Sequence, residues 1–284
     1  MQLRQEHAWH TPKQGKIAAF VAYRCARFMW ISLIFDSTDY IPMQWAWMDP
    51  LLVAISVGIA VMTSTMALQM ARLAHKSPLG RARNLSQLSG AISLAGGIWC
   101  MHFIGMLAFT PCANSNFSVL RSILSALPSL IAAVITMRAL LQAQRTWKSL
   151  TISGLALGVG VAVMHFWGMA AAHSSETFYY TPQQLLLVLA CAMGLSIFAL
   201  VAHHVLQQRG YRPMVVTLLS GGVLGLVVSI IHYMAMSAVH LPVGASALLQ
   251  AATQSHWPVV ITTAAICLLL ASLVLAMNLG LRWR

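Results

Sequence analysis

The sequence predicts an all-α integral membrane protein with seven transmembrane helices, arranged as three repeated helix-pair units. Its composition predicts the membrane class, because 59% of the 284 residues are hydrophobic and only 8% are charged, whereas a soluble domain carries about 25% charged residues. A second observation, a six-residue word that occurs in three related copies, predicts the repeat. The length fits one membrane domain of several helices.

Seven segments are long and apolar enough to span a bilayer, which takes about 20 residues of helix. The segments are 50–71, 86–109, 118–140, 150–172, 183–206, 214–238 and 257–281. The gaps between them are short and hold the charged residues, prolines and polar clusters. They separate a membrane domain, 49–284, from an N-terminal extension, 1–48.

Basic residues fall in alternate gaps, and Arg121 is the exception. They are Arg72, Lys76, Arg81 and Arg83 after the first span, Arg138, Arg145 and Lys148 around the end of the third, Arg209 and Arg212 after the fifth, and Arg282 and Arg284 after the seventh. Membrane proteins concentrate Lys and Arg in their cytoplasmic loops. We therefore expect these gaps and the C-terminus to be cytoplasmic and 110–117, 173–182 and 239–256 to face outward. Topology accounts for most of the net charge of +12, so we expect no nucleic-acid partner.

The extension contains the apolar stretch 18–35, which is interrupted by Arg24 and Arg27. Each central charge costs about 3 kcal/mol on insertion scales. The stretch fits an interfacial helix or an upstream extension better than an extra transmembrane helix, which stays as the alternative. It lacks a clean small-residue cleavage site, so a removed signal peptide is not expected.

The repeated word is MHFIGM at 101–106, MHFWGM at 164–169 and IHYMAM at 231–236. The copies close the second, fourth and sixth spans, so each repeated unit is a pair of helices. The three motif helices run in the same direction, and their histidines, His102, His165 and His232, are expected at one depth near the outer face.

A methionine follows each motif histidine by four residues, and residues four apart share one face of a helix. Each pair can therefore approach one ligand, the pairs being His102 with Met106, His165 with Met169 and His232 with Met236. Met101 and Met164 point about 100° away from their histidines and are weaker candidates. Imidazole with thioether is a soft ligand set that suits copper, especially Cu(I). Haem is the alternative cofactor, because His and Met are both axial ligands.

At these residues the chain resembles the MHYT domain, a bacterial integral membrane sensor module named for a Met-His-Tyr-Thr word. The resemblance covers about 48–284, including the Ser-rich opening of the first span, SVGIAVMTSTMALQMARL (56–73). It implies copper bound by the motif His and Met residues, in the bacterial cytoplasmic (inner) membrane, with sensing of oxygen, CO, NO or redox state. Tyr remains only at Tyr233, and the third copy begins with Ile231.

The first functional hypothesis is therefore a membrane signalling sensor. Many relatives carry a cytoplasmic signalling domain, and this chain ends at LRWR, so we expect a separate cytoplasmic signalling partner besides the lipid bilayer. A copper handling or delivery protein and a haem-binding electron-transfer protein are the alternatives.

Other classes lack the residues they need. The acidic residues are Glu6, Asp36, Asp39, Asp49 and Glu176, and none is central to a span, unlike the carboxylates of proton-coupled transporters. No lysine lies in a span to hold retinal, and no base–nucleophile set is visible, so we expect no enzyme. The five cysteines are scattered and are expected to be small apolar filler rather than a disulfide framework.

Overall fold

The computed structural model describes residues 25–28, 31–35, 39–76, 80–109, 116–142, 146–173 and 178–242, with the single positions 265, 272 and 276. Six spans in this part are long and apolar enough to cross a membrane, which confirms a multi-pass membrane protein and six of the seven predicted spans. They are α2 (Pro50–Lys76), α3 (Arg81–Ala108), α5 and α6 together (Val119–Leu124 and Ala126–Leu140), α7 (Trp147–Ala171), α8 (Pro182–Gln208) and α9 (Pro213–Ser237). The seventh predicted span, 257–281, falls almost wholly outside the described residues.

The third span is broken into α5 and α6 at Ser125, where the sequence predicts one continuous helix. Pro128 is the third residue of α6. Proline has no backbone N–H, so the carbonyl of Leu124 loses its usual helical partner, and the ring crowds that carbonyl. The break is therefore a local consequence of the proline.

The helices pack with α3, α7 and α9 inside and α2, α6 and α8 outside. The inner three contact one another. α2 packs between α3 and α9, α6 between α3 and α7, and α8 between α7 and α9. The most apolar windows of α3, α7 and α9 are 83%, 61% and 56% buried, against 33%, 44% and 28% for α2, the third span and α8. The inner helices are thus those that carry the motif histidines.

Small residues let neighbouring helices approach closely, as membrane packing requires. A Cβ on Gly158 of α7 would lie 2.5 Å from the carbonyl oxygen of Ala192 in α8, and one on Gly154 would lie 2.6 Å from Cα of Ile197. A Cβ on Gly221 of α9 would lie 2.5 Å from Cα of Thr65 in α2. Gly154, Gly158 and Gly221 thus each stand where another helix lies too close for a side chain.

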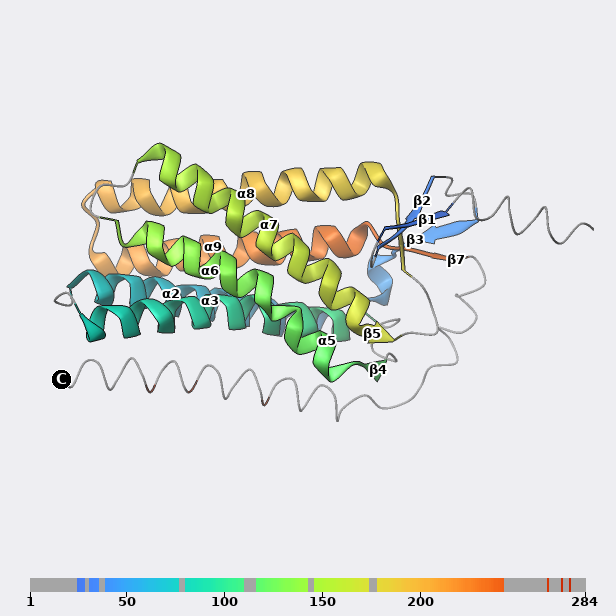
Figure 1. The fold of residues 1–284 in the computed structure, drawn as a ribbon, viewed down its shortest axis with the longest axis horizontal. Coiled ribbons are helices and arrows are strands. Elements are labelled where there is room, and N and C mark those ends of the chain that lie inside the picture. The colour runs from blue at the N-terminus through green and yellow to red at the C-terminus, as the bar shows by residue number, and fades with distance from the viewer. Residues whose placement is uncertain are drawn as a thin grey trace, which may run out of the picture.

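Short strands gather at the end of the bundle where the motif helices finish, which we call the motif end (Figure 1). One sheet has the order β1-β2-β6-β7-β3, and β4 pairs with β5. The strands are β1 (Cys25–Phe28), β2 (Ile31–Ile34), β3 (Tyr40–Pro42), β4 (Asn116–Phe117), β5 (Ala172–His173), β6 (Tyr179–Tyr180) and β7 (His240–Pro242). The opposite end carries basic residues near the helix ends, and we call it the basic end. These residues are Lys76, Arg81, Arg83, Arg138, Lys148, Arg209 and Arg212.

The N-terminal segment corrects one expectation from the sequence. Where described, residues 25–34 form β1 and β2 rather than a helix, and β2 runs parallel to β6. The sequences of β1 and β2, CARF and ISLI, contain Phe and Ile, which are residue types that favour strands. In addition, β6 supplies backbone hydrogen-bond partners for β2, and such distant pairing cannot be read from sequence periodicity. The segment from Tyr40 to Asp49 then runs across the motif end, where the N–H of Met43 donates to the Val239 carbonyl (2.9 Å) and that of Asp49 to the Ala108 carbonyl (2.8 Å).

Cys100 and Asp49 have structural roles, and the disulfide at Cys100 corrects the expectation that the cysteines are small apolar filler. Cys100 is buried and disulfide-bonded, whereas Cys191 is free. Asp49 caps α2, because its carboxylate accepts the N–H groups of Leu51 (2.8 Å) and Leu52 (3.2 Å). A carboxylate there also faces the positive end of the helix dipole.

Candidate metal centre

Three motif histidines meet inside the bundle near the motif end. His102 comes from α3, His165 from α7 and His232 from α9, and each lies within the last two turns of its helix. Because the inner helices run in the same direction and touch one another, equal positions in the repeat reach one level. The predicted common depth is thereby realised as one cluster.

The imidazoles face one another through their Nδ1 atoms. Nδ1 of His232 lies 3.3 Å from Nδ1 of His102 and 3.2 Å from Nδ1 of His165. The ring centroids are 5.0–5.1 Å apart, with interplanar angles of 79°, 90° and 72°. This T-shaped arrangement brings one nitrogen of every ring toward a shared centre, and the nitrogens that could bind an ion lie within 4.8 Å of one another.

The cluster is almost completely removed from solvent, with exposed fractions of 0% for His102 and 1% for His165 and His232. The Nε2 atom of each ring is buried with no hydrogen-bond partner among the described residues. Buried polar atoms are normally paired, so three buried Nε2 atoms without a partner among the described residues mark an unusual cluster. Neutral imidazole is a common metal ligand, and an ion at the centre would bind Nδ1 of each ring.

Gly105 and Gly168 are site residues that the sequence reasoning missed. Each stands three residues after a motif histidine, and a Cβ on either would overlap Nε2 of another motif's histidine: His232 for Gly105 and His102 for Gly168. The signal was present, since both glycines stand in the repeated words MHFIGM and MHFWGM.

The motif methionines divide between two buried clusters on either side of the histidines. Met101 and Met164 pack in the cluster that extends toward the basic end. Met106, Met169 and Met236 pack in the motif-end cluster, which also contains Met43. The weaker standing of Met101 and Met164 as ligands agrees with this division. Ligation by the methionines stays a prediction.

Tyr233 ties the centre to an outer helix. Its ring packs edge-on against His232, with centroids 4.8 Å apart, and its hydroxyl lies 2.5 Å from the hydroxyl of Ser56 in α2. Ser56 belongs to the Ser-rich opening of the first span. A shift of His232 would therefore move Tyr233 and alter its hydrogen bond to Ser56 in α2.

His173 and His240 lie outside the motif helices. The sequence places each eight residues after a motif histidine, but α7 ends at Ala171 and α9 at Ser237, so both histidines lie in strands. His240 is buried, and its Nδ1 lies 3.1 Å from the Ala238 carbonyl.

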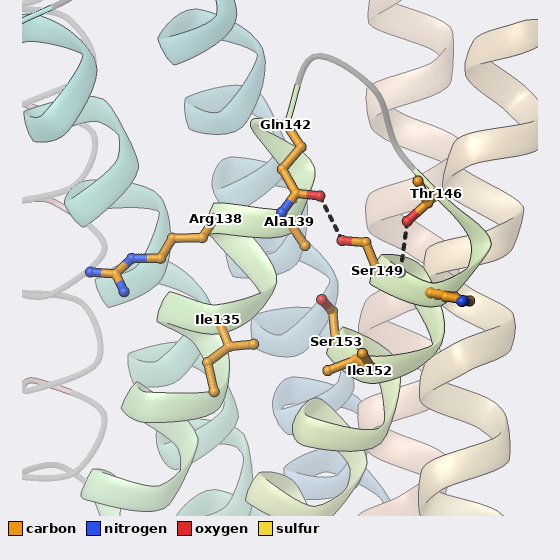
Figure 2. Close-up of a pocket in the computed structure, with 9 residues that line it drawn as sticks. Ile135, Arg138, Ala139, Gln142, Thr146, Ser149, Ile152 and Ser153 are labelled. Carbon is orange, nitrogen blue, oxygen red and sulfur yellow. Dashed lines mark hydrogen bonds between the residues drawn. The ribbon is translucent and has the colours of Figure 1, made fainter.

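A pocket of about 460 Å³ lies between α6 and α7 at the basic end (Figure 2). The Ser149 hydroxyl donates to Gln142 Oε1 (2.7 Å), and the Ser149 N–H donates to the Thr146 hydroxyl (3.2 Å). Figure 2 shows Arg138 pointing away from the Gln142–Ser149 pair. The Gln142–Ser149 contact joins the end of α6 to the start of α7. The pocket is remote from His165, which lies at the other end of α7.

Comparison with known proteins agrees with the motif. The family model MHYT, described as a bacterial signalling protein N-terminal repeat, matches residues 96–153 and 158–218. These two matches contain the first and second histidine motifs. No solved structure matches the chain.

Curated relatives are signalling proteins. The chain is 32% identical over 198 residues to the bifunctional diguanylate cyclase/cyclic di-GMP phosphodiesterase MucR of Pseudomonas aeruginosa, covering 69% of this chain and 28% of MucR. It is 31% identical over 214 residues to the cyclic di-GMP phosphodiesterase NbdA of the same organism, covering 73% of this chain and 27% of NbdA. The chain thus corresponds to less than a third of either relative. Through residues 96–153 and 158–218, this membrane protein belongs to the MHYT family of bacterial signalling proteins.

Proposed function

We propose that this protein is a membrane signalling sensor that holds a copper ion between His102, His165 and His232. The observation that carries the proposal is the convergence of three buried Nδ1 atoms from three helices, with two separations of 3.2 and 3.3 Å. Metal–imidazole bonds of about 2.0–2.1 Å hold their nitrogens about 3.3–3.6 Å apart in tetrahedral or trigonal geometry. The rings therefore need little movement to bind one ion.

The ligand set favours Cu(I) over Zn²⁺. The cluster consists of neutral imidazoles with no carboxylate or thiolate in it, so a divalent ion would bury two uncompensated charges and a cuprous ion only one. Burying unpaired charge is costly. Met106, Met169 and Met236 lie one helical turn further on and offer soft thioethers. The close packing of the three rings suits an ion better than a porphyrin.

The proposed setting is the bacterial inner membrane, with the basic end and the C-terminus in the cytoplasm and the centre near the outer face. The charge bias of the loops supports this orientation. We also propose that 257–281 forms a seventh span and that the helices are three repeated pairs. The arrangement of three inner motif helices, each flanked by outer helices, supports the pairs.

Oxygen, CO, NO or a change of redox state is the proposed signal. A cuprous ion would supply either a coordination position for the gas or a one-electron redox change. The protein's own part is to tie that event to three helices at once, because each helix gives one ligand. The names of MucR and NbdA refer to cyclic di-GMP turnover, and we propose that this chain passes its signal to an equivalent cytoplasmic output.

Copper content of the purified protein tests the assignment. We expect up to one copper per chain, and its loss in the triple variant His102→Ala, His165→Ala, His232→Ala. His203→Ala, which removes a buried histidine of α8 outside the cluster, is the matched control and should keep the metal. Retention of copper by the folded triple variant would reject the site.

Absorption and infrared spectra separate the remaining alternatives. A Soret band would favour the haem protein, and an infrared band of bound carbon monoxide in the reduced, copper-loaded protein would support gas sensing. A deletion strain whose main defect is copper-dependent growth or oxidase assembly would favour copper handling.

A further inference from the structure

Two glycines hold the histidines of neighbouring motifs. A Cβ on Gly168 would overlap Nε2 of His102 and lie 2.8 Å from its Cδ2 and 3.2 Å from its Cε1. A Cβ on Gly105 would overlap Nε2 of His232 and lie 2.9 Å from its Cδ2. Separations below 3.0 Å are not found for real Cβ atoms, so only glycine permits these ring positions. The ring of His232, in the third motif, therefore packs against Gly105 of the first motif. The ring of His102, in the first motif, packs against Gly168 of the second.

We infer that Gly105 and Gly168 are positioning residues that make Nδ1 the metal-binding nitrogen of His232 and His102. This inference rests on the proposed copper centre. The built Cβ on Gly168 is nearer to Cδ2 of His102 than to Cε1, so it lies beside Nε2 and off the axis along which Nε2 would bind an ion. The glycine backbone still occupies the Nε2 side of the ring, and Nδ1 of His102 is left facing Nδ1 of His232 at 3.3 Å.

The third motif differs at the equivalent position. It has Ala235, which is 1% exposed, where the other motifs have glycine. A methyl group at Gly105 or Gly168 would therefore displace a histidine ring. Ala235 shows that the equivalent position of the third motif accommodates a methyl group. Fixed Nδ1 ligation from three directions fits a three-coordinate cuprous ion.

The test compares single variants of the full chain in detergent. Gly105→Ala and Gly168→Ala should each weaken Cu(I) binding about 10–100-fold, the usual effect of disturbing groups that orient ligands. Gly97→Ala is the matched control: it lies on α3 like Gly105, and its Cβ would overlap Thr63 of α2 rather than a histidine. Ala235→Gly is the second control. Cu(I) affinity is measured by competition with a chromogenic chelator, and the unfolding midpoint is measured alongside.

Loss of affinity in Gly97→Ala equal to that in Gly105→Ala and Gly168→Ala would show a general packing effect and overturn the inference. Unchanged affinity in both site variants would overturn it as well. Support requires weaker binding in the two site variants than in both controls, whatever the order of their midpoints.

Nitrogen-15 NMR of histidine-labelled, metal-free protein keeps this inference separate from the copper assignment. The imidazole signals of His232 should shift in Gly105→Ala and those of His102 in Gly168→Ala, with both unchanged in Gly97→Ala. Signals missing from His102→Ala and His232→Ala assign the two rings. If wild-type protein binds no copper, the proposed function and the metal-binding role both fail, and these shifts still decide whether the glycines position the rings. Unshifted signals in both site variants would reject the positioning role itself.

Discussion

At the scale of single residues, the histidine cluster is short of hydrogen-bond partners. A neutral imidazole has one donor and one acceptor nitrogen, and Nδ1 of His232 is approached by Nδ1 of both His102 and His165. One lone pair or one proton on His232 cannot serve both neighbours well. The Nε2 atoms are also unpaired among the described residues, so the cluster is short of partners at both nitrogens. The proposed ion would bind the Nδ1 atoms, so that they would no longer compete for a single proton.

The Ser56–Tyr233 hydrogen bond gives a prediction at this scale. Ser56→Ala should lower the free energy of unfolding by about 1–3 kcal/mol, because it leaves the Tyr233 hydroxyl without this partner. Tyr233→Phe should cost less when added to Ser56→Ala than when made alone. The measurement is a double-mutant cycle of thermal unfolding in detergent. Strictly additive effects would show that the hydrogen bond contributes nothing to the free energy of unfolding.

The sequence predicted the histidines because repetition marks them, and it missed the glycines because their neighbours are distant in the chain. His102, His165 and His232 recur at matching places in three words, so a common depth followed from the repeat. The partner of Gly105 is His232, and nothing local in MHFIGM indicates that contact. Which histidine rests on which motif depends on how the helices are ordered around the bundle axis.

At the scale of elements, helices were predictable and strands were not. Long apolar runs such as 50–71 and 183–206 carry their own signal, since about 20 residues of one character suffice. Strands such as β5 and β6 have two residues each, too few for any periodicity. Their pairing is decided by where the helices end, and this also places His173 and His240 in strands rather than on the motif helices.

The packing of α7 against α8 predicts opposite effects of alanine substitution on the unfolding midpoint at Gly158 of α7 and Gly194 of α8. Gly158→Ala should lower the unfolding midpoint, because its Cβ meets the backbone of Ala192 and Met193 in α8. Gly194→Ala should leave it unchanged or raise it, since nothing lies within 4 Å of a Cβ there and alanine favours the helix by about 1 kcal/mol. Circular dichroism during heating measures both. A larger loss in Gly194→Ala would contradict the packing.

At the scale of the whole molecule, the two ends have different composition. The motif end holds the strands, the aromatic and Met-rich cluster and the histidines, and the basic end holds Lys76, Arg81, Arg138, Lys148, Arg209 and Arg212. The inner helices α3, α7 and α9 connect the two ends, each with a motif histidine near one end and a basic residue at or beside the other. In the proposed sensor, these three helices would carry a change at the histidines to the basic end.

Metal binding should therefore stabilise the entire bundle. An ion that binds only the folded state adds about 2.7 kcal/mol at a concentration 100 times its dissociation constant. We expect Cu(I), or Ag(I) as an air-stable substitute, to raise the unfolding midpoint of the wild type and leave that of the triple histidine variant unchanged. An equal rise in both would place the binding elsewhere.

The segment from Tyr40 to Asp49 determines where a stable fragment of this protein should begin. A fragment begun at residue 49, where the apolar spans start, would lose the pairing of β3 with β7 and the burial of Met43 beside the motif-end methionines. The newly bared apolar surface would lie directly over the histidines. Fragments and fusions built from this chain should therefore include the residues from Tyr40 onward. A boundary chosen from hydropathy alone would remove the segment that covers the motif end.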